Sequence, residues 1–301
     1  MKHLLSLKEL SQSQILAILE LAKKIKAAPE EYRTALDGKS VVMLFEKPSL
    51  RTRVSFDIGI NKLGGHCVYM DQQNGALGKR ESVADFAGNI SQWADGIVAR
   101  TFSHVTIDEL AEYGTVPVIN ALSDLYHPCQ ALADFLTLQE NEGELKNVRL
   151  AYMGDGNNVT HSLMLGAAVL GMQMTVICPE GHFPDGLVVT QAQQLAAAHG
   201  GSLLLTSDVA ALEDVDAVYT DTWISMGDST KLSDIAAKFG QYQVTREMMD
   251  KYQVKYFMHC LPAHRGVEVT DEVMDGAGSL ILQQAQNRMH AQNAVLVTLL
   301  S

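Results

Sequence analysis

Hydroxyl and guanidinium side chains gather in one short segment, residues 46–56, which reads EKPSLRTRVSF and follows an apolar run at 41–45. The planar guanidinium groups of Arg51 and Arg53 can form paired, charge-assisted hydrogen bonds with a phosphate. The hydroxyls of Ser49 and Thr52 can bond to it as well, together with backbone N–H groups where the next helix begins. The same pattern is typical of a helix start whose arginines face water, so the anion site predicted here depends on support from other motifs.

A second group of polar side chains follows two later apolar runs. Arg100 ends the run GIVAR, and His127 and Gln130 lie in YHPCQALADF, after the run VPVI. Pro128 suits the first position of a helix, which would place the imidazole of His127 at the positive end of that helix. A neutral imidazole, an amide and a guanidinium can together polarise a carbonyl group. A histidine that only caps the helix is the alternative.

The loop at 153–162, MGDGNNVTHS, follows an apolar run and opens a helix. Its position invites a dinucleotide-binding interpretation, but Val159 stands where the third glycine of that fingerprint belongs. The amides of Asn157 and Asn158 suit the binding of a small zwitterion, or else the formation of a turn and a helix cap.

Two further loops carry groups that could contact a substrate. Asp221 lies in TDTWISMGD (220–228), where a carboxylate can hold an ammonium group or cap a helix. The loop HCLPAHRG (259–266) contains His259, Cys260 and His264. Because no fourth ligand lies at a usual spacing, we expect no metal there.

Composition limits the classes of function. With 301 residues, 47% of them hydrophobic, the chain can form two domains with sizeable cores. Its net charge of −12 argues against a nucleic-acid or membrane-surface protein, so a local cluster must attract any anionic ligand. The four cysteines are far apart and form no CxxC pair, which favours free thiols in a reducing compartment. With no targeting segment or membrane span in view, we expect a soluble, cytoplasmic protein.

Short β-rich runs alternate with helical periodicity, the pattern of parallel sheets wrapped by helices. We therefore expect an α/β fold of two doubly wound parallel-sheet domains joined by interdomain helices. The polar turn after an expected helix at 129–141 marks the joint: the first domain spans 1–142, the second spans 143–284, and a helix at 285–301 packs back on the first. The expected strands are 40–45, 66–70, 96–100, 117–120, 148–154, 172–178, 202–206, 217–220 and 256–260.

Taken together and in order, these motifs resemble the aspartate/ornithine carbamoyltransferase family over nearly the whole chain. They are SLRTR at 49–53, Arg100, HPCQ at 127–130, GDGNN at 154–158, DTWISMG at 221–227 and HCLP at 259–262. The pair DxWxSMG and HCLP is similar to the ornithine branch, since the aspartate branch has HPLP in place of HCLP. The resemblance implies transfer of the carbamoyl group from carbamoyl phosphate to the δ-amine of L-ornithine, giving L-citrulline and phosphate without a metal or other cofactor.

The resemblance also implies roles for individual residues and domains. The first domain would bind carbamoyl phosphate and the second ornithine, in a homotrimer or an assembly of trimers built through the first domain. The catalytic residues implied are Arg100, His127, Gln130 and Cys260. The carbamoyl phosphate-binding residues implied are Ser49, Leu50, Arg51, Thr52, Arg100, His127, Gln130, Cys260, Leu261 and Arg288, with Arg53 supporting the loop. The ornithine-binding residues implied are Leu122, Asn158, Asp221, Ser225 and Met226, under a lid formed by the loop 225–240.

Two departures from the family pattern leave alternatives open. Leu50 replaces a threonine, as in the branches that act on acylated ornithines, although a position that contributes its backbone N–H should tolerate the change. Ala76 stands where a neighbouring subunit often supplies glutamine, so either the alignment slips or Lys79 or Arg80 compensates. Transfer to an acylated ornithine or another amine is therefore an alternative, and a non-catalytic assembly subunit is a third. The SMG motif argues against the former and the retained arginines against the latter.

Overall fold

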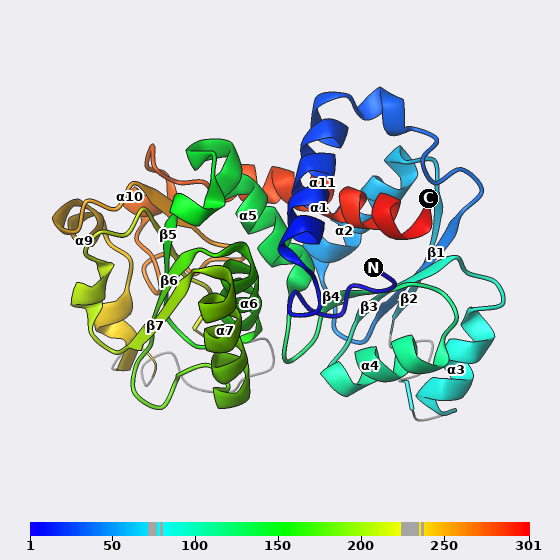
Figure 1. Cartoon of the computed structure of the whole chain (residues 1–301), viewed down its shortest axis with the longest axis horizontal. Helices are drawn as coiled ribbons and strands as arrows, with labels where there is room; N and C mark the ends of the chain where they lie inside the picture. The colour runs from blue at the N-terminus through cyan, green and yellow to red at the C-terminus, as the bar shows by residue number, and fades with distance from the viewer. Residues whose placement is uncertain (72–76, 79–80, 224–234, 236–237) are drawn as a thin grey trace. The chain divides into compact units, whose positions relative to one another are not determined.

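The computed structural model of the chain describes residues 1–71, 77–78, 81–223, 235 and 238–301. It contains two compact units, Met1–Leu136 with Asn287–Ser301 as unit 1, and Thr137–Gln286 as unit 2 (Figure 1). Both boundaries lie inside helices, α5 (Pro128–Glu142) and α11 (Ile281–Leu300). The chain therefore passes from one unit to the other within α5, before the polar turn where the sequence places the joint.

Unit 1 contains a four-stranded parallel sheet with the order β2-β1-β3-β4. Its strands β1 and β3 are buried almost throughout, which is why they read as continuous apolar runs in the sequence. The strands are β1 (Ser40–Phe45), β2 (His66–Asp71), β3 (Gly96–Arg100) and β4 (Val118–Leu122). The helices are α1 (Gln12–Ala27), η1 (Pro29–Tyr32), α2 (Leu50–Lys62), α3 (Val83–Ile90) and α4 (His104–Tyr113), together with parts of α5 and α11.

The direction of the strand order reverses between β1 and β3. Helix α2 leads from β1 outward to β2, whereas α3 and α4 lead back to β3 and on to β4. Because such crossovers are right-handed, α2 covers one face of the sheet and α3 and α4 cover the other (Figure 1). Ligands of open parallel sheets bind beyond the carboxyl ends of the strands at this reversal. The segment that follows β1 and the arginine that ends β3 therefore lie at the edge of the sheet where the topology favours ligand binding.

Unit 2 contains a five-stranded parallel sheet with the order β7-β6-β5-β8-β9, which reverses between β5 and β8. Helices α6 and α7 connect the strands on one side of this reversal and pack against each other. The strands are β5 (Arg149–Met153), β6 (Gln173–Ile177), β7 (Ser202–Thr206), β8 (Ala217–Tyr219) and β9 (Tyr256–Met258). The helices are η3 (Leu145–Asn147), α6 (Asn158–Leu170), α7 (Gly186–His199), η4 (Val209–Leu212), η5 (Gly240–Tyr242), α9 (Arg246–Lys251) and α10 (Asp271–Met274).

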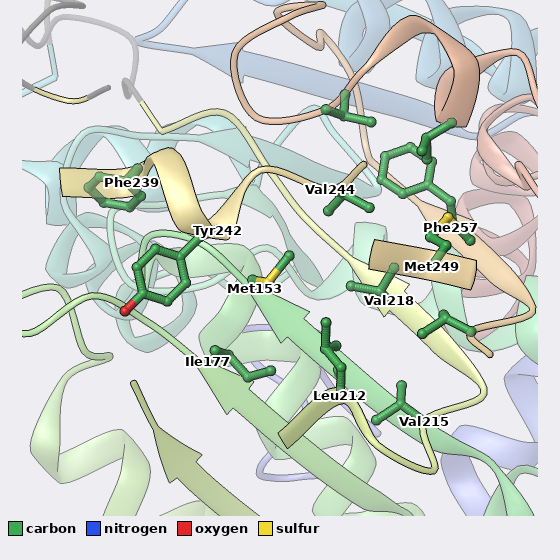
Figure 2. Close-up of a cluster of buried hydrophobic side chains, with 14 of the residues drawn as sticks. Met153, Ile177, Leu212, Val215, Val218, Phe239, Tyr242, Val244, Met249 and Phe257 are labelled. Carbon is green, nitrogen blue, oxygen red and sulfur yellow. The ribbon is translucent and has the colours of Figure 1, made fainter. Parts of the chain in front are cut away.

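One hydrophobic cluster of unit 2 runs along its strands and reaches their carboxyl ends. Figure 2 shows Met153 at the end of β5 and Ile177 at the end of β6, with Tyr242 nearby. The rings of Trp223 and Phe239 belong to the same cluster, with centroids 5.1 Å apart. These apolar contacts fix the strand ends from which the loops of unit 2 begin.

The sequence-based expectation of two doubly wound α/β units is confirmed, and each expected strand is present with ends that differ by at most two residues. The closing helix begins earlier than expected, at Ile281 instead of residue 285. Within the part of the chain that the structure describes, none of the helices combines the length and apolar character needed to span a bilayer.

Candidate active site

The segment after β1 forms the first turn of α2. Ser49 caps this helix: its Oγ accepts a hydrogen bond from the backbone N–H of Thr52 at 3.3 Å, and its hydroxyl donates to Thr52 Oγ1 at 2.8 Å. The helix N-terminus provides backbone donors with no acceptor inside the helix, together with the positive end of the helix dipole. The side chain of Leu50 is 77% exposed, so this position can offer its N–H while its side chain points elsewhere.

The two arginines of this turn have different surroundings. Arg51 is exposed. The guanidinium of Arg53 lies over the ring of Tyr69, 3.7 Å from its centroid, which is a cation–π contact with strand β2. This contact ties the first turn of α2 to strand β2 through Arg53.

Arg288 connects two of the sequence motifs within unit 1. From α11, its buried guanidinium donates to Thr52 Oγ1 at 2.6 Å and to Gln130 Oε1 at 3.0 Å. Gln130 in turn donates from Nε2 to Asp134 Oδ1 at 2.8 Å. Because the nitrogen of that amide has two protons, it can also donate to a carbonyl oxygen. Tertiary packing thus joins the phosphate-type segment and the HPCQ motif into one hydrogen-bonded group.

Arg100 and His127 are both almost fully buried. Arg100 ends β3, and its carbonyl accepts a bond from the backbone N–H of Glu46, which ties the ends of β1 and β3 together. His127 precedes α5, and its carbonyl accepts the first bonds of that helix from Gln130 and Ala131. Burial, then the nearby charges of Arg288 and Arg100, lowers the pKa of His127 well below its usual value of 6.5. His127 is therefore neutral at physiological pH and can donate a hydrogen bond without carrying a charge.

In unit 2, three loops meet at the carboxylate of Asp221, which follows β8. Asn157 Nδ2 donates to Asp221 Oδ2 at 2.9 Å, and the thiol of Cys260 donates to Asp221 Oδ1 at 3.2 Å. The carboxylate is almost fully buried, with 6% of its residue exposed. Burial and the charge of Asp221 raise the pKa of the neighbouring Tyr152 well above its usual value. A buried anion in such a place can attract an ammonium group.

A buried histidine and a buried glutamate hydrogen-bond to the HCLP turn and stabilise it. The N–H of Leu261 donates to His259 Nδ1 at 2.9 Å, so His259 Nε2 carries the proton and faces Glu268 Oε1 at 3.3 Å. Glu268 also accepts from the backbone N–H of His264. The backbone of Leu261 lies in the left-handed region, with φ of 59°. The buried pair therefore stabilises the unusual backbone that follows Cys260.

Asp221, His259 and Cys260 place potential ligand atoms within 4.8 Å of one another, the only such arrangement among the residues that the structure describes. Both nitrogens of His259 already have partners, in Leu261 and Glu268. The donor set therefore suits hydrogen bonding within the loop better than coordination of a cation.

Some of the remaining expected site residues lie in unit 1, some lie in unit 2, and others lie outside the described part of the chain. Leu122 ends β4 in unit 1, whereas Asn158, Cys260 and Leu261 belong to unit 2. Asn158 is the first residue of α6, and its neighbour Asn157 donates a hydrogen bond to Asp221. Expected residues that lie outside the described part of the chain are Ser225, Met226, Ala76, Lys79, Arg80 and most of the loop 225–240.

Sequence reasoning missed two buried acids that support site residues. Asp134 accepts from Gln130, and Glu268 faces His259. The first had a usable signal, because Gln130 and Asp134 are four residues apart on one helix and so lie on the same face. Glu268 had no such signal in the sequence, because the fold of the loop between residues 259 and 268 determines that it meets His259.

Family models match both parts of the chain. A model described as the carbamoyl-P binding domain of aspartate/ornithine carbamoyltransferase matches residues 2–140, and one described as the Asp/Orn binding domain matches residues 146–299. The chain belongs to the aspartate/ornithine carbamoyltransferase family. The resemblance inferred from the six motifs is therefore confirmed.

Named members of this carbamoyltransferase family match over the full length. The ornithine carbamoyltransferase of Shewanella oneidensis is 73% identical over 301 residues, which cover 100% of both chains. The anabolic ornithine carbamoyltransferase of Pyrococcus furiosus is 46% identical over 98% of this chain and 95% of its own. The solved structure of an ornithine carbamoyltransferase from Pyrococcus furiosus has a TM-score of 0.95 at 45% identity, covering 99% of this chain and 97% of that one.

Proposed function

We propose that this protein transfers the carbamoyl group of carbamoyl phosphate to the δ-amine of L-ornithine, releasing L-citrulline and phosphate. The observation that carries the proposal is the bridge formed by Arg288, which hydrogen-bonds both Thr52 and Gln130. It joins a segment suited to phosphate with a group suited to a carbonyl, and carbamoyl phosphate contains both. The 73% identical relative named ornithine carbamoyltransferase supports ornithine as the acceptor.

The phosphate would bind at the start of α2. Arg51 would supply paired hydrogen bonds, and the first-turn N–H groups and the Ser49 hydroxyl would complete its surroundings. Binding an anion here needs no broad basic surface, in keeping with a net charge of −12. The same contacts would stabilise the phosphate as it leaves, because negative charge grows on the bridging oxygen as the bond to carbon breaks.

Arg100, His127 and Gln130 would act on the carbamoyl carbonyl. The lowered pKa of His127 keeps the imidazole neutral, so it polarises the carbonyl as a hydrogen-bond donor. Together the three donors would stabilise the oxyanion that forms when the amine attacks and the carbon becomes tetrahedral. The amine attacks the bound donor directly, so no acyl group is attached to the enzyme.

Ornithine would bind to the loops of unit 2, with Asp221 facing its α-ammonium group and Asn158, Ser225 and Met226 completing the contacts. Leu122 would line the pocket, and Cys260 and Leu261 would lie near the reacting amine. The attacking δ-amine must be uncharged, although a free alkylammonium has a pKa of about 10.4. We therefore expect the rate at subsaturating ornithine to rise with pH as the neutral amine becomes more abundant.

Family membership also supports finer features of the assignment. We propose a cytoplasmic homotrimer, or an assembly of trimers, that acts in arginine biosynthesis. Support for the compartment comes from the four cysteines, all of which are free thiols. Support for an oligomer comes from α2, where Leu50, Val54 and Ile58 lie four residues apart and are each exposed.

A panel of acceptors tests the proposal directly. Carbamoyl phosphate is supplied with ornithine, N-acetylornithine, putrescine or aspartate, and the carbamoylated product is measured without added metal or nucleotide. We expect ornithine to give the highest kcat/KM. A higher value with any of the other three would reject the assignment.

A variant tests the phosphate half of the same proposal. Arg51→Ala should lower kcat/KM for carbamoyl phosphate by at least about 10²-fold, the scale for losing one preorganised donor. Arg265→Ala is the matched control, because Arg265 forms exposed ion pairs with Asp271 and Asp275 instead. Near-normal rates for Arg51→Ala would contradict the phosphate assignment.

A further inference from the structure

We infer that Asn157 is a positioning residue, whose side chain sets the direction in which the Asp221 carboxylate presents its charge to the amino-acid substrate. The inference rests on the proposed function, which pairs Asp221 with the α-ammonium group of that substrate. It concerns the asparagine next to Asn158, the residue that the family resemblance assigns to ornithine binding.

The amide of Asn157 can take only one orientation. Its Oδ1 caps α6, accepting from the backbone N–H groups of Val159 at 2.9 Å and Thr160 at 3.2 Å. Because these partners are donors, the oxygen must face the helix and the NH2 group must face away from it. That NH2 group meets Asp221 Oδ2 at 2.9 Å. The cap therefore determines that Asn157 donates to Asp221.

Asp221 is held at both of its carboxylate oxygens. Asn157 donates to Oδ2, and the thiol of Cys260 donates to Oδ1 at 3.2 Å. A carboxylate that is held at both oxygens cannot rotate freely about its Cβ–Cγ bond. An arriving ammonium group then meets a charge that already points in one direction, so binding loses less conformational entropy.

Helix α6 makes Asn157 a firm support. All of its residues from Val159 to Leu170 are buried, so the helix is fixed by packing on every side. Its start follows β5, whereas Asp221 follows β8, and these two strands pair in parallel at the strand-order reversal of unit 2. Asn157 thus links two loops that the sheet brings together, and it transmits the position of the helix to the carboxylate.

Three variants separate the cap from the amide donor. Asn157→Ser keeps a capping oxygen and removes the amide NH2 group that reaches Asp221, whereas Asn157→Ala removes both. Asp185→Ser is the control, because Asp185 caps α7 in the same unit and exchanging it for serine also preserves a cap. Each variant is assayed for KM and kcat with ornithine, for KM with carbamoyl phosphate, and for Tm.

For Asn157→Ser we expect the KM for ornithine to rise about 10-fold, the scale for losing one hydrogen bond to a charged group. Its KM for carbamoyl phosphate should stay within about 2-fold and its Tm within about 2 °C, because the cap remains. Asn157→Ala should show the same rise in KM together with a lower Tm, and Asp185→Ser should leave both KM values unchanged. An unchanged KM for ornithine in Asn157→Ser would overturn the inference, because a residue that only caps α6 predicts that result.

Crystal structures of the wild type and Asn157→Ser give a readout that needs no activity. We expect the Asp221 carboxylate to rotate about its Cβ–Cγ bond when the amide is removed. An Asp221 that keeps its orientation in the variant overturns the inference whatever the substrate. If the wild-type enzyme fails to use ornithine but the Asp221 carboxylate is rotated in Asn157→Ser, the proposed function is rejected and the role of Asn157 stands.

Discussion

Three buried side chains lie near one another in unit 1: the guanidinium groups of Arg100 and Arg288 are close enough to the imidazole of His127 to affect its pKa. Burial, and then the two guanidinium charges, act on the imidazole in the same direction and lower the pKa of His127. The result is a site that holds positive charge for an anion while one of its donors stays neutral. Sequence spacing located His127, but its protonation state follows from burial.

The shifted pKa of His127 has a consequence for stability. Since its folded-state pKa lies below the unfolded value of 6.5, the unfolded chain binds more protons just below that pH. The neutral imidazole therefore leaves the free energy of unfolding at its full value above pH 6.5. Below that pH the free energy of unfolding falls by up to about 1.4 kcal/mol per pH unit. His127→Gln should therefore show a smaller loss of Tm between pH 7.5 and pH 5.5 than the wild type.

Thermal unfolding at both pH values tests this expectation, with His66→Gln as the control, since His66 is exposed on β2. The His66→Gln control should show the same difference in Tm between the two pH values as the wild type. If His127→Gln also keeps the full wild-type difference, burial of a neutral imidazole does not contribute to acid sensitivity.

Among the secondary-structure elements, short loops between a strand and a helix carry most of the site. In each case a cap fixes the loop: Ser49 for α2, and Asn157 for α6. The loop before α6 has an additional constraint, because Gly156 lies against the backbone of residues 183–184 and donates its N–H to the carbonyl of His182 at 2.9 Å. Glycine is required at position 156 because the backbone of residues 183–184 leaves no room for a Cβ atom, and not because of its φ angle.

Gly156→Ala should destabilise unit 2 and displace the two asparagines that follow. The added Cβ would clash with the backbone nitrogen of Pro184 and lie 2.6 Å from the carbonyl carbon of Phe183, neither of which can move alone. We expect a loss of about 1–3 kcal/mol in the free energy of unfolding, measured by urea denaturation, and a higher KM for ornithine. Gly186→Ala is the control, because its Cβ meets nothing within 4 Å. Equal stability of Gly156→Ala and the control would disprove the steric argument.

At the scale of the whole molecule, the exposed apolar face of α2 is the feature that suggests contact with a second subunit. Val54 and Ile58 are 44% and 46% exposed on the helix that begins with the proposed phosphate-binding turn. An interface on this face would fix α2 and the turn at its start. Oligomerisation and phosphate binding would then depend on the same helix.

Ile58→Asp should convert the proposed trimer into smaller species, because a charge would be buried in the interface without a partner. Size-exclusion chromatography with light scattering measures the mass, and specific activity is expected to fall with it. Leu187→Asp is the control, since Leu187 is 83% exposed on α7 in unit 2. A variant at Ile58 that keeps the wild-type mass would show that this face of α2 is not the interface.

Much of the fold and the outline of the candidate site could be predicted from the sequence, because both depend on local chemistry. Apolar runs predicted the strands, and Pro128 indicated a helix start. The positions of Arg51, Arg100, His127 and Asp221 followed from the rule that loops at the carboxyl ends of parallel strands bind ligands. Periodicity and loop chemistry involve residues near one another in the chain, so a single sequence contains them.

Contacts between distant segments were decided only by tertiary structure. The bond from Arg288 to Thr52 spans 236 positions, and the bond from Asn157 to Asp221 spans 64. The pKa of His127 likewise depends on burial and on arginines from other elements. Strand order and helix packing bring these groups together, and no local pattern specifies which partners will meet. Residue types and their spacing therefore indicated which groups could react, whereas long-range packing set their orientation and charge.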